Sequence, residues 1–96
     1  MSEFTVTHHP GDTSGLFHLE QGGRRVGYLD YSLSGETMRI HYVEVSSSLR
    51  GTGLGRQLID AAVAWARGEQ KRIVPICGYA RAVLQRTPAF ADVLMS

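Results

Sequence analysis

The sequence predicts an α/β domain of the layered α+β type, with a mixed, mainly antiparallel sheet. Three observations lead to this class. Residues 4–45 alternate between extended runs and glycine-containing turns, residues 54–67 have helical periodicity, and a further strand and helix follow. Hairpin-linked strands can share a sheet with a strand that is reached through a helix, so one layered unit accommodates all of these elements.

Four strands are expected in the first half of the chain. The first is FTVTHH, residues 4–9, which alternates weakly. Two more lie in residues 15–33, separated by residues 21–24, where glycines can supply the positive φ of a hairpin turn. After a second turn, MRIHYVEV at residues 38–45 is rich in β-branched and aromatic side chains and predicts the fourth strand.

Successive side chains of a strand point to alternate faces of the sheet. In the fourth strand this would put the large apolar residues on both faces, with Met38, Ile40 and Tyr42 on one face and Val43 and Val45 on the other. An unbroken strand cannot turn all five toward one core. We therefore expect a β-bulge between Tyr42 and Glu44, because one additional residue moves the following side chains to the other face.

The second half predicts helix, strand and helix. From Leu54, apolar residues recur at steps of three and four, and the helix is expected to stop at Gly68. KRIVPIC, residues 71–77, is a short apolar run typical of a buried strand. A second helix is expected to end before Pro88, and the apolar tail to pack back on the sheet.

Composition limits the function. With 96 residues the chain is expected to form a single domain, residues 1–96, and its net charge of +1 provides no broad basic surface for a nucleic acid. The single cysteine, Cys77, can build neither a disulfide nor a zinc site within the chain, which favours a reducing, cytoplasmic location. No apolar run is long enough for a membrane span, so no membrane partner is expected.

The stretch RGTGLGR, residues 50–56, stands between the fourth strand and the first helix. Unpaired backbone N–H groups at a helix N-terminus attract anions, and the three glycines leave room for phosphate oxygens to approach the main chain. Arg50 and Arg56 can add charge-assisted hydrogen bonds from the two edges. The loop therefore predicts a phosphate or pyrophosphate site.

Two common phosphate-binding loops do not match this stretch. A Walker loop ends in Gly-Lys-Ser/Thr, but Gly55 is followed by Arg56 and Gln57. A dinucleotide-binding fold requires G-x-G-x-x-G with an acidic residue about 20 positions further on, and neither feature is present.

The loop instead resembles the acetyl-CoA loop of the Gcn5-related N-acetyltransferases, Arg/Gln-x-x-Gly-x-Gly/Ala. Nearly the whole chain is similar to the small YjdJ-type group of that superfamily, including the stretches IHYVEV, VPICGYA and TPAFADVL. The resemblance implies a minimal domain of that fold, with acetyl-CoA as acyl donor and CoA as product. It also implies that the fourth strand splays from the fifth and that the cofactor contacts the following residues: Val43, Val45, Arg50, Gly51, Thr52, Gly53, Leu54, Gly55 and Arg56.

Amide formation from a thioester requires a deprotonated amine, a stabilised oxyanion and a stabilised or protonated thiolate. Glu44 is a candidate general base, because family members often use a carboxylate on this strand, although a solvent-facing carboxylate is an equal alternative. His41 lies nearby and is a second candidate, but a histidine on a half-buried strand is more often a hydrogen-bonded structural residue. The other histidines have no metal-ligand spacing, so no metal is expected.

Cys77 and Tyr79 lie where the fifth strand gives way to the second helix. Cys77 is a candidate nucleophile that would carry the acetyl group, or else an apolar lining residue. The resemblance implies that Tyr79 can act as an acid toward the leaving thiolate, although it stands closer to the strand than that role suggests.

The acceptor is expected to be a primary amine of a protein, peptide or small molecule. Only a short turn separates the first two predicted strands, so the helices that build an acceptor cleft in larger acetyltransferases are missing, and the protein is expected to be a monomer or a homodimer. Two other readings stay open: a CoA-binding sensor or adaptor without turnover, and a small interaction domain whose loop binds nothing.

Overall fold

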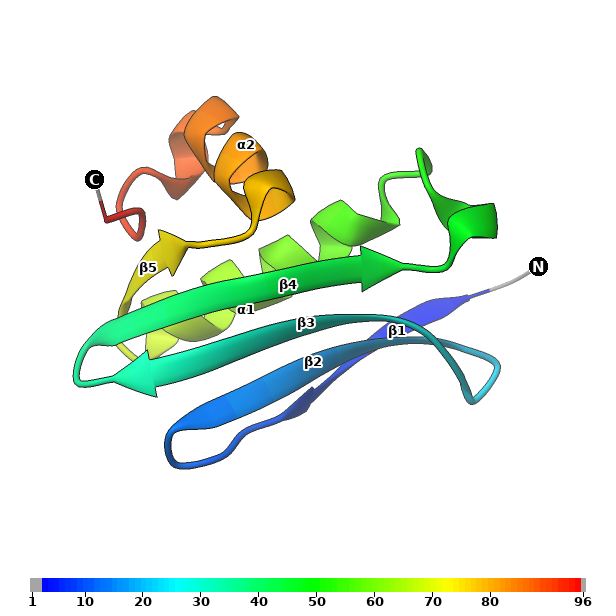
Figure 1. Cartoon of the computed structure of the whole chain (residues 1–96), viewed down its shortest axis with the longest axis horizontal. Coiled ribbons are helices and arrows are strands. Elements are labelled where there is room, and N and C mark those ends of the chain that lie inside the picture. Colours follow the sequence, from blue (N-terminus) through cyan, green and yellow to red (C-terminus); the bar gives the residue numbers. More distant parts are fainter. Residues whose placement is uncertain (1–2, 96) are drawn as a thin grey trace.

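Five strands form one sheet in the order in which they occur along the chain, β1-β2-β3-β4-β5 (Figure 1). The computed structural model describes residues 3–95. Its strands are β1 (Phe4–His9), β2 (Ser14–Gln21), β3 (Arg24–Ser34), β4 (Thr37–Val45) and β5 (Arg72–Pro75), and its helices are α1 (Leu54–Gly68) and α2 (Gly78–Arg86). The β1 to β4 pairs are antiparallel and β4 pairs with β5 in parallel, so the predicted mixed α/β fold is confirmed.

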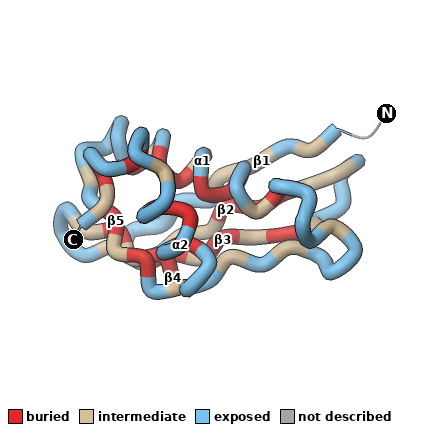
Figure 2. The backbone as a smooth tube through the Cα atoms, turned by 90° about the horizontal axis from the view of Figure 1, so that it is seen from above, coloured by how far each residue is buried: buried red, intermediate tan, exposed pale blue. Residues whose placement is uncertain are grey.

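Helix α1 lies along one face of the sheet, where it contacts every strand (Figure 1). Its buried side chains face those of the strands, and the buried positions gather where helices and sheet meet (Figure 2). The helix buries Leu54, Leu58, Ile59, Ala62, Val63 and Ala66, and the sheet buries Phe17, Leu19, Leu29, Tyr31, Met38, Ile40 and Ile73. The apolar stripe predicted from the three- and four-residue steps is therefore the packing face of α1.

The other face of β1 to β4 is turned away from α1 and is not covered by a helix (Figure 1). We call it the open face. One row of directly opposed residues crosses it, from Thr7 through His18 and Tyr28 to Glu44. Alternation along each strand puts these residues on the face opposite to Leu19, Leu29 and Val43.

The expected bulge in β4 is present, but it lies just before the predicted range. Asp30 pairs with Tyr42 and Tyr31 pairs with Ile40, so His41 is the additional residue. The shift brings Val43 and Val45 to the face of Ile40 and leaves Tyr42 59% exposed. The phase change showed that an additional residue was required after Ile40, but not which residue it would be.

Strand β5 is shorter than predicted, and its end shapes the site. The last β4–β5 pair joins Ile40 to Pro75, and the N–H groups of Ile76 and Cys77 both donate to the Ile40 carbonyl, at 2.9 and 3.2 Å. The chain then turns into α2 instead of continuing beside β4. The apolar tail packs back on the sheet as predicted, with Leu94 bridging to Ile73.

An aromatic cluster closes the core beside β1. The His8 ring stacks on Phe17 with centroids 4.0 Å apart, and its Nε2 lies 2.6 Å from the Tyr31 hydroxyl. Trp65 of α1 approaches His8 edge-on at 5.1 Å. Burial lowers the pKa of His8, and the neighbouring His9 lowers it further. None of the helices in the described part of the chain has the length and apolar character needed to span a bilayer.

Candidate acyl-CoA site

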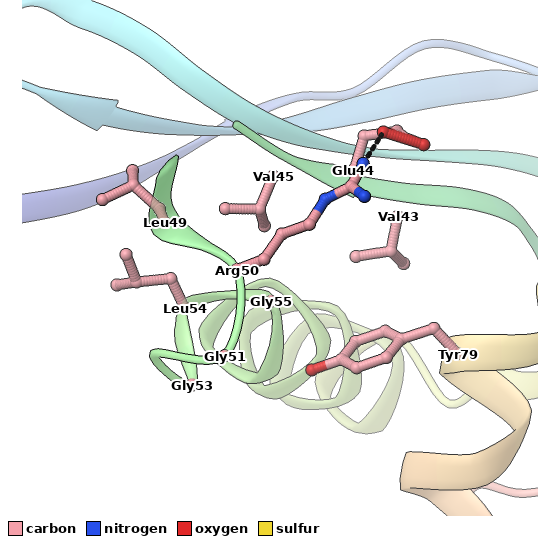
Figure 3. A pocket seen from close by; sticks show the side chains of 10 residues that line it. All are labelled: Val43, Glu44, Val45, Leu49, Arg50, Gly51, Gly53, Leu54, Gly55 and Tyr79. Carbon is pink, nitrogen blue, oxygen red and sulfur yellow. Dashed lines mark ion pairs between the residues drawn. The ribbon is translucent and has the colours of Figure 1, made fainter. Parts of the chain in front are cut away.

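A hollow of about 430 Å³ opens between the end of β4, the glycine loop and the start of α2 (Figure 3). It exists because β4 and β5 part after Ile40. Within residues 3–95, no strand pairs with the β5 side of residues 43–45. Its lining residues are Val43, Glu44, Val45, Leu49, Arg50, Gly51, Gly53, Leu54, Gly55 and Tyr79.

The floor of the hollow is the N-terminus of α1. Gly53 is the N-cap residue, without a side-chain hydrogen bond to the helix, and the first turn contains no acidic residue. The first N–H groups of α1 therefore have no capping side chain, and they stand at the positive end of a helix of 15 residues. This is the arrangement that binds phosphate groups.

Two of the loop glycines have backbone conformations that favour glycine. Gly51 has φ +81° and Gly53 has φ +82°, and a Cβ at either position would meet no protein atom within 4 Å. The space beside them is open, so an anion can reach the main chain there.

Gly55 lines the hollow with the other two loop glycines, and it also lies against Tyr79. A Cβ on Gly55 would lie 2.9 Å from the Tyr79 hydroxyl and 3.1 Å from two carbons of its ring. The missing side chain thus makes room for the phenol of Tyr79, which reaches from α2 across the start of α1 (Figure 3). Tyr79 is 40% exposed and lines the hollow, so one phenol is held close to the glycine loop.

Arg50 and Glu44 form an ion pair across the top of the hollow (Figure 3), with Nη2 and Oε2 3.6 Å apart. Their side chains are 67% and 53% exposed. An exposed pair of this kind contributes at most about 1 kcal/mol to stability. The pair is therefore weak enough to be exchanged when a stronger anion reaches Arg50.

The remaining predicted residues do not line the hollow. Thr52 donates its hydroxyl to the Leu49 carbonyl, and Arg56 lies over the Phe90 ring and pairs with Asp60. Nε2 of His41 lies 2.8 Å from the Ser32 hydroxyl. Cys77 precedes α2, is partly buried and packs against the core.

Sequence reasoning did not identify Leu49 as a lining residue, and the signal for it was weak: an apolar residue just before the loop. Among the described residues no group of three or more side chains is arranged to bind a metal ion.

The chain matches the family model described as GCN5-related N-acetyl-transferase over residues 16–93. No curated protein matches it significantly. Similar solved structures include a GCN5-like protein of Staphylococcus aureus, with 23% identity and a TM-score of 0.73 over 94% of this chain and 88% of that one.

Longer proteins share the fold as well. A GNAT-family protein of Desulfovibrio desulfuricans has 18% identity and a TM-score of 0.65, with 77% of this chain and 54% of that one covered. A Bacillus anthracis protein solved with acetyl coenzyme A has 18% identity and a TM-score of 0.61, with 68% and 38% covered. The chain thus spans about half of the first of these and less of the second. Because the family model covers most of the chain and the fold agrees, this protein belongs to the GCN5-related N-acetyltransferases.

Proposed function

We propose that this protein binds acetyl-CoA in the 430 Å³ hollow and transfers the acetyl group to a primary amine. The observation that carries the proposal is the open backbone cradle at Gly51 and Gly53, placed at an uncapped helix N-terminus beside an unpaired strand edge. The proposal includes the small YjdJ-type group, a single minimal domain over residues 1–96, a cytoplasmic location, and a monomer or homodimer with neither nucleic acid nor membrane as partner.

The residues around the hollow suit the donor. The N–H groups at Gly53 and in the first turn of α1 would hold the pyrophosphate, with Arg50 as its counter-charge. The free peptide groups at Val43 and Val45 would hydrogen-bond the amides of the pantetheine arm, as a strand edge does with an extended ligand. Bound acetyl-CoA would supply a thioester, whose acetyl carbon bonds the amine nitrogen as the C–S bond breaks.

Glu44 would take the proton from the attacking amine. Its carboxylate stands at the edge between the hollow and the open face, and Arg50 is the partner that holds it there. When Arg50 turns to the pyrophosphate, Glu44 is released to accept a proton. Tyr79 would return a proton to the departing sulfur, since its hydroxyl already lies in the hollow.

Cys77 and His41 are weaker candidates for direct chemistry. Cys77 packs against the core, which suits an apolar filler, and a covalent route would require its sulfur to reach the acetyl carbon. His41 shares a hydrogen bond with Ser32, which suits a structural role or a proton relay from the open face.

Calorimetry with acetyl-CoA and CoA tests the binding part of the proposal. We expect both to bind, and absence of binding at millimolar ligand would refute the proposed function. Thiol release with lysine peptides, N-terminal peptides and polyamines then tests turnover. Binding without acetylated product in any of these classes would leave the alternative, a CoA-dependent sensor or adaptor, which the helix-free open face would suit.

A further inference from the structure

The path of the donor determines where the acceptor amine must arrive. A pantetheine arm that runs from the glycine loop along Val45 and Val43 would carry the thioester toward Ile40, where β4 and β5 part. The helix side of this position is taken by the donor and by the core, in which Ile40 is buried. The open face has no helix over it (Figure 1), so the amine has to approach from that face, past the exposed Tyr42.

Strand register places two carboxylates and two phenols together on the open face. Asp30 of β3 is directly opposite Tyr42 of β4, and Tyr28 is directly opposite Glu44. Because residues two apart on a strand point to the same face, these four residues form one block, which we call the acidic-aromatic block. Its carboxylates lie on one diagonal and its phenols on the other, and diagonal positions of neighbouring strands are about 7–8 Å apart.

Asp30 is the free carboxylate of the block. Within residues 3–95 it has no ion-pair partner, whereas Glu44 pairs with Arg50. Arg39 lies on the same face of β4, but it is opposite Ser32, on the other side of the bulge. Once Arg50 engages the pyrophosphate, the block has two uncompensated carboxylates, and these attract positive charge.

A buried nitrogen beside the block also lacks a partner. His18 of β2 is directly opposite Tyr28, so it lies on the open face and diagonal to Asp30. It is only 8% exposed, and its Nδ1 is buried without a hydrogen-bond partner among the described residues. Burial lowers the pKa of His18, and the charge of Arg25 lowers it further. A neutral imidazole can accept a hydrogen bond from an ammonium group.

We propose that the acidic-aromatic block is the acceptor subsite, and that it selects a primary amine whose carrier has a second ammonium group a few atoms away. This inference rests on the proposed function. The attacking amine would lie beside Tyr42, between the acetyl carbon and Glu44. The second ammonium would bind Asp30, with the phenol faces of the block around it.

The second ammonium takes no part in the chemical step. The amine nitrogen bonds the acetyl carbon as the C–S bond breaks, and the proton of the amine passes to Glu44. A short diamine and a lysine beside another basic residue share the required chemistry.

Thiol release from acetyl-CoA tests the selection with putrescine, butylamine and γ-aminobutyrate, which end in an ammonium, a methyl and a carboxylate group on chains of similar length. We expect kcat/KM to fall in that order. Asp30→Asn should lower the ratio of kcat/KM for putrescine to that for butylamine about fivefold, as the loss of one exposed charge pair allows. Asp30→Lys should turn the preference toward γ-aminobutyrate.

Asp12→Asn is the matched control. Asp12 is exposed in the turn between β1 and β2, outside the block, so this variant loses the same charge and should keep the ratio of the parent. A ratio that survives Asp30→Asn unchanged would overturn the subsite.

Two dipeptides with blocked termini, Lys-Arg and Lys-Gln, repeat the comparison for lysine acceptors. A preference for Lys-Arg that Asp30→Asn removes, without such an effect on the small amines, would assign the subsite to basic protein segments. The same effect on putrescine alone would assign it to free polyamines.

NMR separates this inference from the function beneath it. Putrescine added to CoA-saturated protein should shift the imidazole signals of His18 and the amide signals of Asp30 and Tyr42. These shifts without thiol release would leave the subsite standing and refute catalysis. Thiol release with the same ratio in the parent and in Asp30→Asn, and without these shifts, would leave the enzyme standing and refute the subsite.

Discussion

Replacing Gly53 by alanine should damage CoA binding far more than it damages the fold. Gly53 has φ +82°, so an alanine there costs about 1–2 kcal/mol of stability. For a domain of this size that corresponds to a fall in Tm of roughly 4–16 °C. The new Cβ would meet no protein atom within 4 Å, so it would stand in the space where phosphate oxygens approach the backbone.

The expected loss of affinity follows from the hydrogen bonds that the methyl group would prevent. A backbone hydrogen bond to a charged group contributes about 1.5–3 kcal/mol, so losing one weakens CoA binding at least tenfold. Calorimetry measures the affinity and thermal melting measures the stability. Alanine is preferable to valine here, because a β-branched residue adds strain at a positive φ.

Gly35 provides the matched control. It has φ +60°, a Cβ there would also meet nothing within 4 Å, and it lies in the turn before β4, at the other end of that strand from the hollow. Gly35→Ala should lower Tm by a comparable amount and leave CoA affinity unchanged. Equal affinities for CoA in the two variants would refute the placement of the phosphate cradle.

Three further predictions concern the neighbouring residues. Gly55→Ala should displace the Tyr79 phenol, since the added Cβ would lie 2.9 Å from the Tyr79 hydroxyl. The turnover of the Gly55→Ala variant, measured by thiol release, should therefore fall to that of Tyr79→Phe. A fully active Gly55→Ala variant would contradict the proposed role of the contact between Gly55 and Tyr79. Cys77→Ala should keep the turnover of the parent if the thiol only packs against the core. The covalent route would be established by two results together: the intact mass of the parent gains one acetyl group at Cys77, and the Cys77→Ala variant loses turnover. The pKa of His8 is lowered in the folded protein, so the imidazole of His8 binds a proton more readily in the unfolded chain. The contribution of neutral His8 to stability is therefore complete above about pH 6.5 and declines as the pH falls below that value. Tm measured from pH 7.5 to 5.5 should therefore fall less in His8→Asn than in the parent, and an unaltered slope would count against a half-buried, neutral His8.

Local patterns were sufficient for most of the fold. Alternation, turn glycines and the helical steps from Leu54 to Trp65 act over a few residues, so the sequence shows them directly. The predicted position of the bulge was wrong by one residue, because the phase change between Ile40 and Val43 requires one additional residue but does not say which one it is. The end of β5 was missed because it depends on two N–H groups sharing the carbonyl of Ile40, which is remote in sequence.

The features of the candidate site likewise include some that the sequence could predict and some that it could not. The open backbone at Gly51 and Gly53 was predictable, because the glycines, the preceding strand and the following helix are contiguous. The contact of Tyr79 with Gly55 was not, since it requires α2 to pack against the start of α1.

The agreement between strand order and chain order has a consequence for folding kinetics. Strands β1 to β4 are a meander in which each hairpin forms from adjacent residues, so their assembly requires only short loop closures. The parallel pairing of β5 with β4 is different, because it joins Thr37 to Arg72 across the whole of α1. We therefore expect the β4–β5 seam to dock last and to open first in native-state hydrogen exchange. Because the acyl-CoA hollow lies at the end of that seam, a bound ligand should slow exchange there before it slows exchange anywhere else in the sheet.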